Sequence, residues 1–233
     1  MKTKLFKKIK NFLPLIIIPL LMSCKGDFDL AEMSFPINIA PIKEKFKIEE
    51  DKSFADITRY ITKDKKAMNF YGSNFAGSNG TEPFTLDNKV SFYEENKSKK
   101  VDAYEIDINT TSEAEDFEKL ITSKLGKADF FYKNKDFSFI IWENAGKYYF
   151  FETNNTGELN GKGFKSCTLR VVNPQNTLFT NYFIAGGFQY FGDYLYEKNK
   201  PENKGKTFTY KDFINAKEKE DGKDSYFLKD YVK

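Results

Sequence analysis

Histidine does not occur among the 233 residues of the chain, and its absence limits the chemistry that the chain can perform. Without an imidazole there is no Ser-His-Asp or Cys-His pair to activate a nucleophile. Zinc and iron sites that use histidine are excluded for the same reason. We therefore expect no catalytic residue of these types, no metal site and no cofactor, and carboxylates remain as the main reactive groups.

Two of these carboxylates, Glu143 and Glu152, fall on strands that the sequence predicts to be neighbours. A glycosidase needs its two carboxylates about 5 Å or about 6.5–9.5 Å apart, which the sequence alone does not establish. The loop at 152–163 could also offer oxygen atoms to a calcium ion, but its Asn/Gly content is more typical of a solvated hairpin loop. A carboxylate-dependent hydrolase is kept as an alternative, and we expect the protein not to be an enzyme.

The segment 72–80, GSNFAGSNG, has a superficial similarity to a phosphate-binding loop. It lacks the Gly-Lys-Ser/Thr ending of a P-loop and does not join a clear strand to a helix. We therefore expect it to be an ordinary loop.

Cys167 lies in the segment 166–173, SCTLRVVN, which is predicted to be a buried strand. A reactive thiol needs a nearby cation or a helix N-terminus, and the sequence shows neither around Cys167. We expect this cysteine to be a small buried hydrophobic residue.

The second cysteine, Cys24, ends a pattern that is typical of a secretory signal. Five lysines come first, without an acid among them, and an apolar run of about a dozen residues follows. This run is broken by Pro14 and Pro19 and is shorter than the roughly 20 residues that span a bilayer as a helix. An ordinary signal peptide with an incidental cysteine is the alternative interpretation.

The tetrapeptide Leu21-Met22-Ser23-Cys24 resembles the lipobox of bacterial lipoproteins. The resemblance implies that residues 1–23 are a signal peptide that is removed, and that Cys24 is the lipidation site, carrying a thioether-linked diacylglyceryl group and an N-acyl chain. Several acyl chains anchor a protein stably, whereas one myristoyl-length chain does not. We therefore expect a lipid-anchored protein of the cell envelope, at the outer membrane, and leave open whether it faces the periplasm or the cell surface.

The charge of the mature chain argues against a nucleic-acid partner. Five of the 37 basic residues and none of the 34 acids lie in the signal segment, so the remaining 210 residues carry a net charge of −2. No basic excess is left to bind phosphates. The 17% aromatic content is interpreted as core and strand filling.

The sequence divides into a tether at 24–35 and one α+β globular domain at 36–233. The clearest element is a helix that begins with a capping box, Ser112 with Glu115, and ends at Gly126. A strand at 101–108 precedes it, and strands at 137–143, 148–153 and 166–173 follow, the first two joined by a hairpin connection at 144–147. This predicts a β-α-β-β-β core over 101–173, an antiparallel sheet with a helix packed on one face.

The flanking segments carry weaker patterns. We expect an edge strand at 35–42, an amphipathic helix at 52–62, a loop at 69–83 and a short helix at 210–220. The packing of residues 174–233 stays open.

The function that best fits these features is a non-catalytic binding or scaffold role at the cell envelope, with a protein partner there and the membrane reached through the lipid on Cys24. An immunity or inhibitor lipoprotein that neutralises a toxin or hydrolase is an alternative, by analogy between folds only. The carboxylate-dependent hydrolase is the third possibility.

Overall fold

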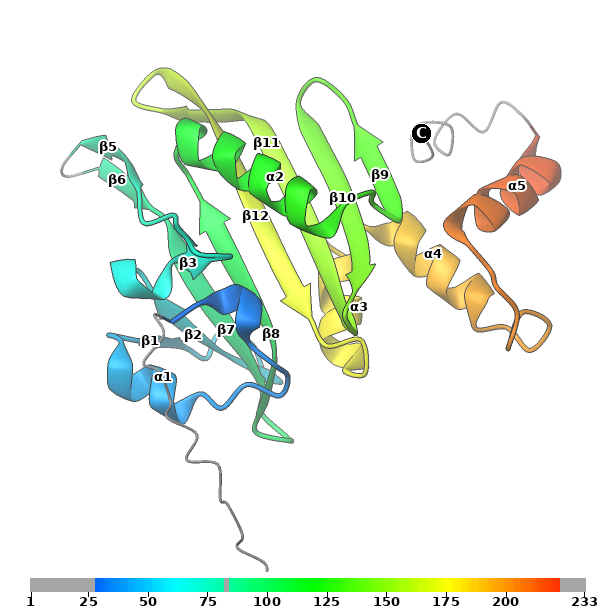
Figure 1. Ribbon diagram of the computed structural model, residues 1–233, viewed down its shortest axis with the longest axis horizontal. Helices are drawn as coiled ribbons and strands as arrows, with labels where there is room; N and C mark the ends of the chain where they lie inside the picture. The colour runs from blue at the N-terminus through cyan, green and yellow to red at the C-terminus, as the bar shows by residue number, and fades with distance from the viewer. Residues whose placement is uncertain (1–27, 82–83, 223–233) are drawn as a thin grey trace, which may run out of the picture.

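The computed structural model describes residues 28–81 and 84–222, and within them the chain forms an eight-stranded sheet (Figure 1). The strand order is β1-β2-β7-β8-β12-β11-β10-β9, and every neighbouring pair is antiparallel. The prediction of an α+β fold with an antiparallel sheet is therefore confirmed.

The strands of this sheet are β1 (Glu49–Asp51), β2 (Ile57–Thr62), β7 (Lys89–Glu95), β8 (Lys100–Ile108), β9 (Phe130–Lys133), β10 (Phe137–Asn144), β11 (Lys147–Leu159) and β12 (Lys162–Val172). Two small two-stranded pieces stand apart: β3 (Asn69–Phe70) with β4 (Ser73–Asn74), and β5 (Ser78–Thr81) with β6 (Phe84–Asp87). The helical elements are η1 (Leu30–Glu32), α1 (Ala40–Lys45), η2 (Lys65–Ala67), α2 (Thr111–Leu125), α3 (Thr177–Ile184), α4 (Gln189–Lys198) and α5 (Tyr210–Asp221).

Helices cover both faces of the sheet. On one face, called the α2 face, Phe117 and Ile121 of α2 join Tyr104 and Ile106 of β8 in one buried cluster, and α2 lies in front of the sheet in Figure 1. On the opposite face, called the α3 face, aromatic residues of α3, α4 and α5 pack on Tyr93, Phe150 and other sheet residues. The sequence predicted a helix on one face only, because residues 174–222 had no assigned packing.

The helix α2 begins two residues earlier than the sequence predicted. Its N-cap is Thr110, and no side chain there caps a backbone amide. The carboxylate of Glu113 instead accepts hydrogen bonds from Thr110 Oγ1 and from Asn88 Nδ2, each at 2.6 Å. The predicted Ser112–Glu115 capping box is therefore wrong, because the register of the helix start is set by contacts with the strand-end residue Asn88.

The end of α2 at Gly126 agrees with the sequence. Gly126 has φ +73° and ψ −144°, a conformation in which a side chain is strained, and a Cβ added there would meet no atom within 4 Å. The effect of Gly126→Ala therefore comes from backbone strain and not from a steric clash. We expect the substitution to lower the free energy of unfolding by about 1–3 kcal/mol. Urea denaturation followed by circular dichroism measures this effect.

Gly163→Ala is the matched control. Gly163 has no positive φ, and a Cβ there would meet only Gly157 O at 3.8 Å. We expect Gly163→Ala to change the free energy of unfolding by less than about 0.5 kcal/mol. Equal losses in the two variants would contradict the conformational explanation.

The hairpin predicted between 137–143 and 148–153 is formed by β10 and β11. The register continues to Asn144 opposite Lys147, so the connection is only Ala145-Gly146. Both connecting residues have positive φ, +49° and +71°, as the tight hairpin turns of type I′ require. The short strand β9 before this hairpin was not predicted, so four strands follow α2 where the sequence indicated three.

Two predictions near the N-terminus are wrong. The segment 35–42 holds the start of α1 and a single bridge between Ile37 and Val101, not an edge strand. The segment 52–62 contains the strand β2, not a helix, and β2 pairs with both β1 and β7. β-Branched residues such as Ile57 and Thr58 favour the strand, and pairing on both sides outweighs the weak helical spacing.

The predicted tether at 24–35 is folded from residue 28 onward. Leu30 is completely buried on the α2 face, and the Tyr104 hydroxyl donates a hydrogen bond of 2.8 Å to the Leu30 carbonyl. The Lys147 ammonium donates to the Met33 carbonyl. The signal peptide 1–23 and the predicted lipidation site Cys24 lie outside the described residues.

Candidate functional site

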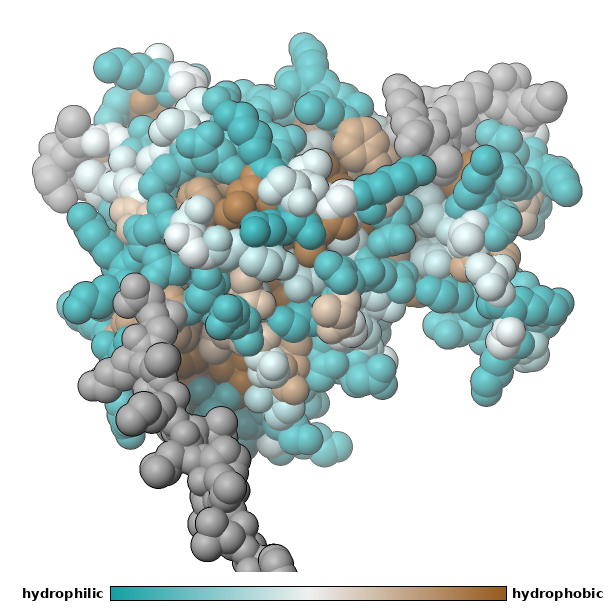
Figure 2. All heavy atoms as spheres, viewed as in Figure 1, coloured by the Kyte–Doolittle hydropathy of each residue, from teal (hydrophilic) through white to brown (hydrophobic). Residues whose placement is uncertain are grey.

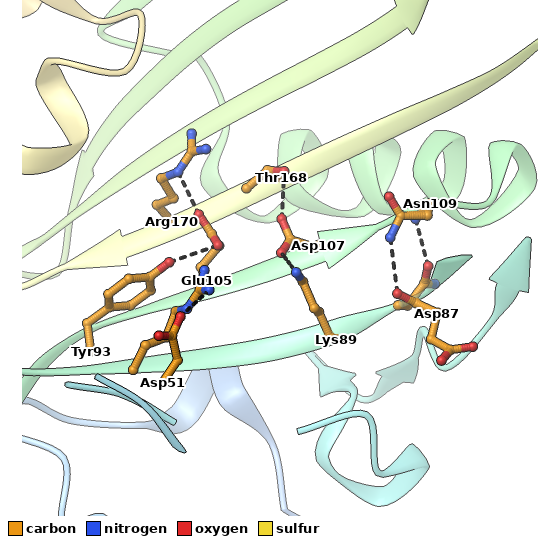
Figure 3. A network of polar contacts seen from close by, with 11 residues as sticks. Asp51, Asp87, Lys89, Tyr93, Glu105, Asp107, Asn109, Thr168 and Arg170 are labelled. Carbon is orange, nitrogen blue, oxygen red and sulfur yellow. Dashed lines mark hydrogen bonds and ion pairs between the residues drawn. The ribbon is translucent and has the colours of Figure 1, made fainter. Parts of the chain in front are cut away.

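A line of polar side chains crosses the α3 face from β1 to β11, perpendicular to the strands. Figure 3 shows its members Asp51, Tyr93, Glu105 and Arg170. Sheet pairing brings these side chains together: Asp51 lies opposite Arg59, Arg59 opposite Tyr93, and Glu105 opposite Arg170. We call this set the polar strip; it consists of Asp51, Arg59, Tyr93, Glu105, Arg170 and Glu152. Both arginines of the chain belong to it.

Glu105 is the centre of the polar strip. Its carboxylate accepts a hydrogen bond from the Tyr93 hydroxyl at 2.9 Å and from Arg170 Nε at 2.8 Å. The residue is only 7% exposed, and this burial raises the pKa of Glu105, with the negative charge of Asp107 adding to the effect. The ion pair with Arg170 and the Tyr93 hydrogen bond oppose this rise in pKa.

Arg170 joins two of the three acids of the polar strip, Glu105 and Glu152. Its Nη1 donates to Glu152 at 3.1 Å, and its guanidinium lies 5.7 Å from the centre of the Phe183 ring of α3. Burial alone would lower the pKa of Arg170, but the charges of Glu105 and Glu152 outweigh it and raise the pKa. The guanidinium is therefore a permanent cation held between two carboxylates and an aromatic ring.

Two further ion pairs lie on neighbouring strands, one between β1 and β2 and one between β7 and β8. Arg59 Nη2 lies 2.7 Å from the Asp51 carboxylate. Hydrogen bonds from the Ser53 hydroxyl and amide, together with Arg59, lower the pKa of Asp51 to about 2. Beside the strip, Asp107 accepts from Thr168 Oγ1 at 2.9 Å and lies 3.4 Å from Lys89 Nζ.

These contacts occupy the carboxylates of this part of the sheet. Each of Asp51, Glu105, Asp107 and Glu152 has a cationic partner at 3.4 Å or less. Within residues 28–81 and 84–222, no group of three or more Asp, Glu, Cys or His side chains is placed to hold a metal ion. The arrangement fixes side chains in place and presents an ionic surface; it does not supply an unpaired base or nucleophile.

The structure separates the two glutamates that the sequence suggested as a pair. Glu143 lies opposite Tyr148, and Glu152 lies opposite Phe139. Four residues of β11 thus separate their positions, which is about 13 Å along a strand. Glu143 contacts Lys198 while Glu152 contacts Arg170, so these two carboxylates do not form a glycosidase pair.

Cys167 is buried on β12 beneath α2, as its sequence predicted. It is 2% exposed, and its thiol donates a weak hydrogen bond to the Ala114 carbonyl at 3.9 Å. Burial raises the pKa of the Cys167 thiol well above its ordinary range. The residue is therefore not a nucleophile.

The two loop segments considered for ion binding are occupied by internal contacts. Residues 152–163 form the ends of β11 and β12, where Asn154 Oδ1 accepts from the amide and hydroxyl of Thr156. In the segment 72–80, the amide of Gly72 donates to the Asp29 carboxylate at 2.6 Å, as the amide of Tyr71 does at 3.0 Å. The Asp29 carboxylate thus holds the amides at the start of this segment, where a phosphate would have to bind.

Two surface cavities lie beside the helices of the α3 face. One, of about 570 Å³, lies between α3 and α4 and is lined by apolar side chains such as Ile184, Leu195 and Tyr196. The other, of about 530 Å³, lies between α5 and the base of β9, with Lys127 and Lys211 at its wall. The residues that line these two cavities do not include Glu105, the centre of the polar strip.

Sequence reasoning missed the polar strip except for Glu152. The segment 101–108 was predicted only as a strand, with no role for Glu105, although Glu105 is buried. A signal was present in the two arginines of a lysine-rich chain, each of which lies in a strand. Arg170 stands within the apolar run TLRVV, where an unpaired charge would be costly.

Comparisons with protein-family models, with curated proteins and with solved structures find no match to this chain. Among the described residues, no helix has the length and apolar character needed to cross a membrane.

Proposed function

We propose that this protein is a lipid-anchored cell-envelope protein that works by binding a partner and not by catalysis. The observation that carries this proposal is the short separation in sequence between the lipobox-like motif and the first described residue of the domain. The lipobox-like sequence ends at Cys24, and Phe28, the first described residue, accepts a hydrogen bond from Asn69 on its carbonyl. A lipid on Cys24 would therefore hold the whole domain at a bilayer.

The chemistry of the domain supports a binding role. The chain has no histidine, its buried thiol is inert, and the carboxylates of the polar strip are neutralised by Arg59 and Arg170. What remains on the surface is a rim of paired charges and a few exposed aromatic side chains, of which Tyr196 is 70% exposed beside the cavity between α3 and α4. Partly apolar, partly ionic surfaces of this kind suit protein partners.

The anchor predicts the behaviour of Cys24→Ala. We expect this variant to move from the membrane fraction to the soluble fraction, because removal of the thiol removes the attachment of the diacylglyceryl group. Fractionation of cells followed by immunoblotting measures the change, and intact-mass analysis of the purified protein shows whether the mature chain begins at a modified Cys24.

Cys167→Ala is the matched control, since it removes the other cysteine from a site that no lipid can reach. We expect it to stay in the membrane fraction. A Cys24→Ala variant that still sediments with membranes, or an unmodified sulfur at position 24, would contradict the proposal.

The binding role is tested by cross-linking the anchored protein in cells and purifying it in detergent. We expect one envelope protein to be recovered in near-stoichiometric amount. A toxin or hydrolase as that protein would define the binding role as inhibition. Recovery of no stoichiometric partner would contradict a binding role.

A further inference from the structure

The way the chain leaves the fold determines which side of the domain can face a bilayer. This inference rests on the lipid anchor proposed above. Three residues lie between Cys24 and Phe28, and the four Cα–Cα steps that join them span at most about 14 Å when fully extended. Any point of the domain near Phe28 must therefore lie close to the lipid headgroups.

The position of Phe28 is fixed by three parts of the structure. Its carbonyl accepts from Asn69 Nδ2 at 3.1 Å, and its ring packs edge-on against Phe46 at 4.9 Å. The next residue, Asp29, binds the amides of Tyr71 and Gly72. The exit point of the chain is thus tied to the end of α1 and to the β3–β4 turn, in the layer that covers the α2 face.

Lysines surround this exit point. Lys45 Nζ lies 5.5 Å from the centre of the Phe28 ring, and Lys124 Nζ, at the end of α2, lies 5.6 Å from the centre of the Tyr71 ring. Neither lysine forms an ion pair with another described residue, so both can meet lipid phosphates. Two exposed acids, Glu32 and Glu44, lie on η1 and α1, so this surface is only weakly basic. The short link, more than the charge, holds the surface at the bilayer.

The surface on this side is suited to lying on a bilayer and not to entering it. Figure 2, which shows the side that carries α1 and α2, has hydrophilic residues over most of the visible surface. The polar strip and the helices α3, α4 and α5 lie on the opposite face of the sheet.

We propose that the domain lies with η1, the end of α1 and the end of α2 against the phosphate headgroups of the bilayer, and that the α3 face is turned to the aqueous phase. The surface formed by η1, the end of α1 and the end of α2 thus contacts the same membrane that holds the lipid anchor. The cavity between α3 and α4, with the exposed side chain of Tyr196 beside it, is then open to a partner.

The test uses the full lipidated protein in vesicles of equal parts phosphatidylcholine and phosphatidylglycerol that contain a nitroxide-headgroup lipid as quencher. Lys45→Cys and, as the matched control, Lys211→Cys on α5 each introduce one exposed thiol for a fluorophore, since Cys24 is blocked by lipid and Cys167 is buried. We expect the label at position 45 to be quenched several-fold more than the label at position 211.

A second variant tests the role of the short link. A Gly/Ser linker of roughly 20 residues inserted after Gly26 adds a flexible spacer of about 25 Å. We expect the quenching at position 45 to fall towards that at position 211 when the linker is present.

The outcomes separate this inference from the proposal on which it rests. A protein that floats with the vesicles and carries a lipidated Cys24, but shows equal quenching at positions 45 and 211, would overturn the orientation and leave the anchor intact. A protein that lacks the lipid and does not float would overturn both.

Discussion

Replacement of Arg170 by methionine is expected to lower the free energy of unfolding by about 3–5 kcal/mol at neutral pH. The loss comes from Glu105, which is 7% exposed and would keep its charge without a cation beside it. Breaking a buried ion pair by removing one partner has a cost of this size. Methionine preserves much of the packing against Phe183, so the change isolates the charge.

The destabilisation of Arg170→Met should depend on pH, with a sign that follows from Glu105. Burial raises the pKa of Glu105 in the folded protein above its ordinary value of 4.5, and loss of Arg170 would raise it further. The folded variant then binds a proton more tightly than the unfolded chain does. The contribution of Glu105 to stability is therefore fully present below about pH 4.5 and is lost as the pH rises through its folded-state pKa. Urea denaturation at pH 5 and at pH 7 should show a larger deficit at pH 7.

Two further variants decide whether the unpaired charge is the cause. The double variant Arg170→Met with Glu105→Gln removes the charge, and we expect it to recover part of the stability and to lose the pH dependence that Glu105 causes. Arg59→Met breaks the more exposed pair with Asp51 and should cost only about 0–1 kcal/mol. A pH-independent loss in Arg170→Met, or an equal loss in Arg59→Met, would contradict this account of the polar strip.

The elements that the sequence predicted well are those whose signals are local and agree with one another. Gly126 ends α2 because it can adopt a positive φ, and the apolar spacing of Phe117 and Ile121 marks the buried side of that helix. The β10–β11 hairpin follows from two aromatic runs joined at Ala145-Gly146. In each case a few neighbouring residues suffice to specify the geometry.

The elements that were predicted wrongly depend on contacts distant in the sequence. The segment 52–62 contains a strand because β1 and β7 pair with β2 on its two sides. Residues 28–35 have no periodic pattern, yet Leu30 is fully buried. Its carbonyl accepts a hydrogen bond from the hydroxyl of Tyr104, which lies far along the chain. Local propensity contains no information about such partners.

The polar strip could not be predicted because it is assembled by sheet register. Its members come from six different strands, and a shift of one residue in any pairing would turn a side chain to the opposite face. The suggested pairing of Glu143 with Glu152 also depended on register. Both residues are on the α3 face, but the observed register places them four residues apart along the strands. Residue types indicated which side chains are costly to bury, and only the pairing showed how they are neutralised.

Replacement of Phe117 by alanine is expected to lower the free energy of unfolding by about 3–5 kcal/mol. Phe117 is fully buried between α2 and the sheet. Its ring centre lies 4.8 Å from that of Phe75, 5.3 Å from that of Phe70 and 6.2 Å from that of Phe151. The change would leave a cavity where α2 meets β3, Phe75 and β11, which come from distant parts of the chain and cannot all close around it.

The sole tryptophan, Trp142, provides the measurement, because it is 2% exposed and donates a hydrogen bond to the Gly126 carbonyl at the end of α2. Its fluorescence should report the unfolding of the core that contains Phe117 in guanidinium chloride. Phe84→Ala is the control, since Phe84 is 65% exposed and its loss should cost less than about 0.5 kcal/mol. A similar cost for both phenylalanines would contradict the interpretation that buried aromatics hold this fold together. A small cost for Phe84 combined with loss of the cross-linked partner would identify β6 as part of the binding surface.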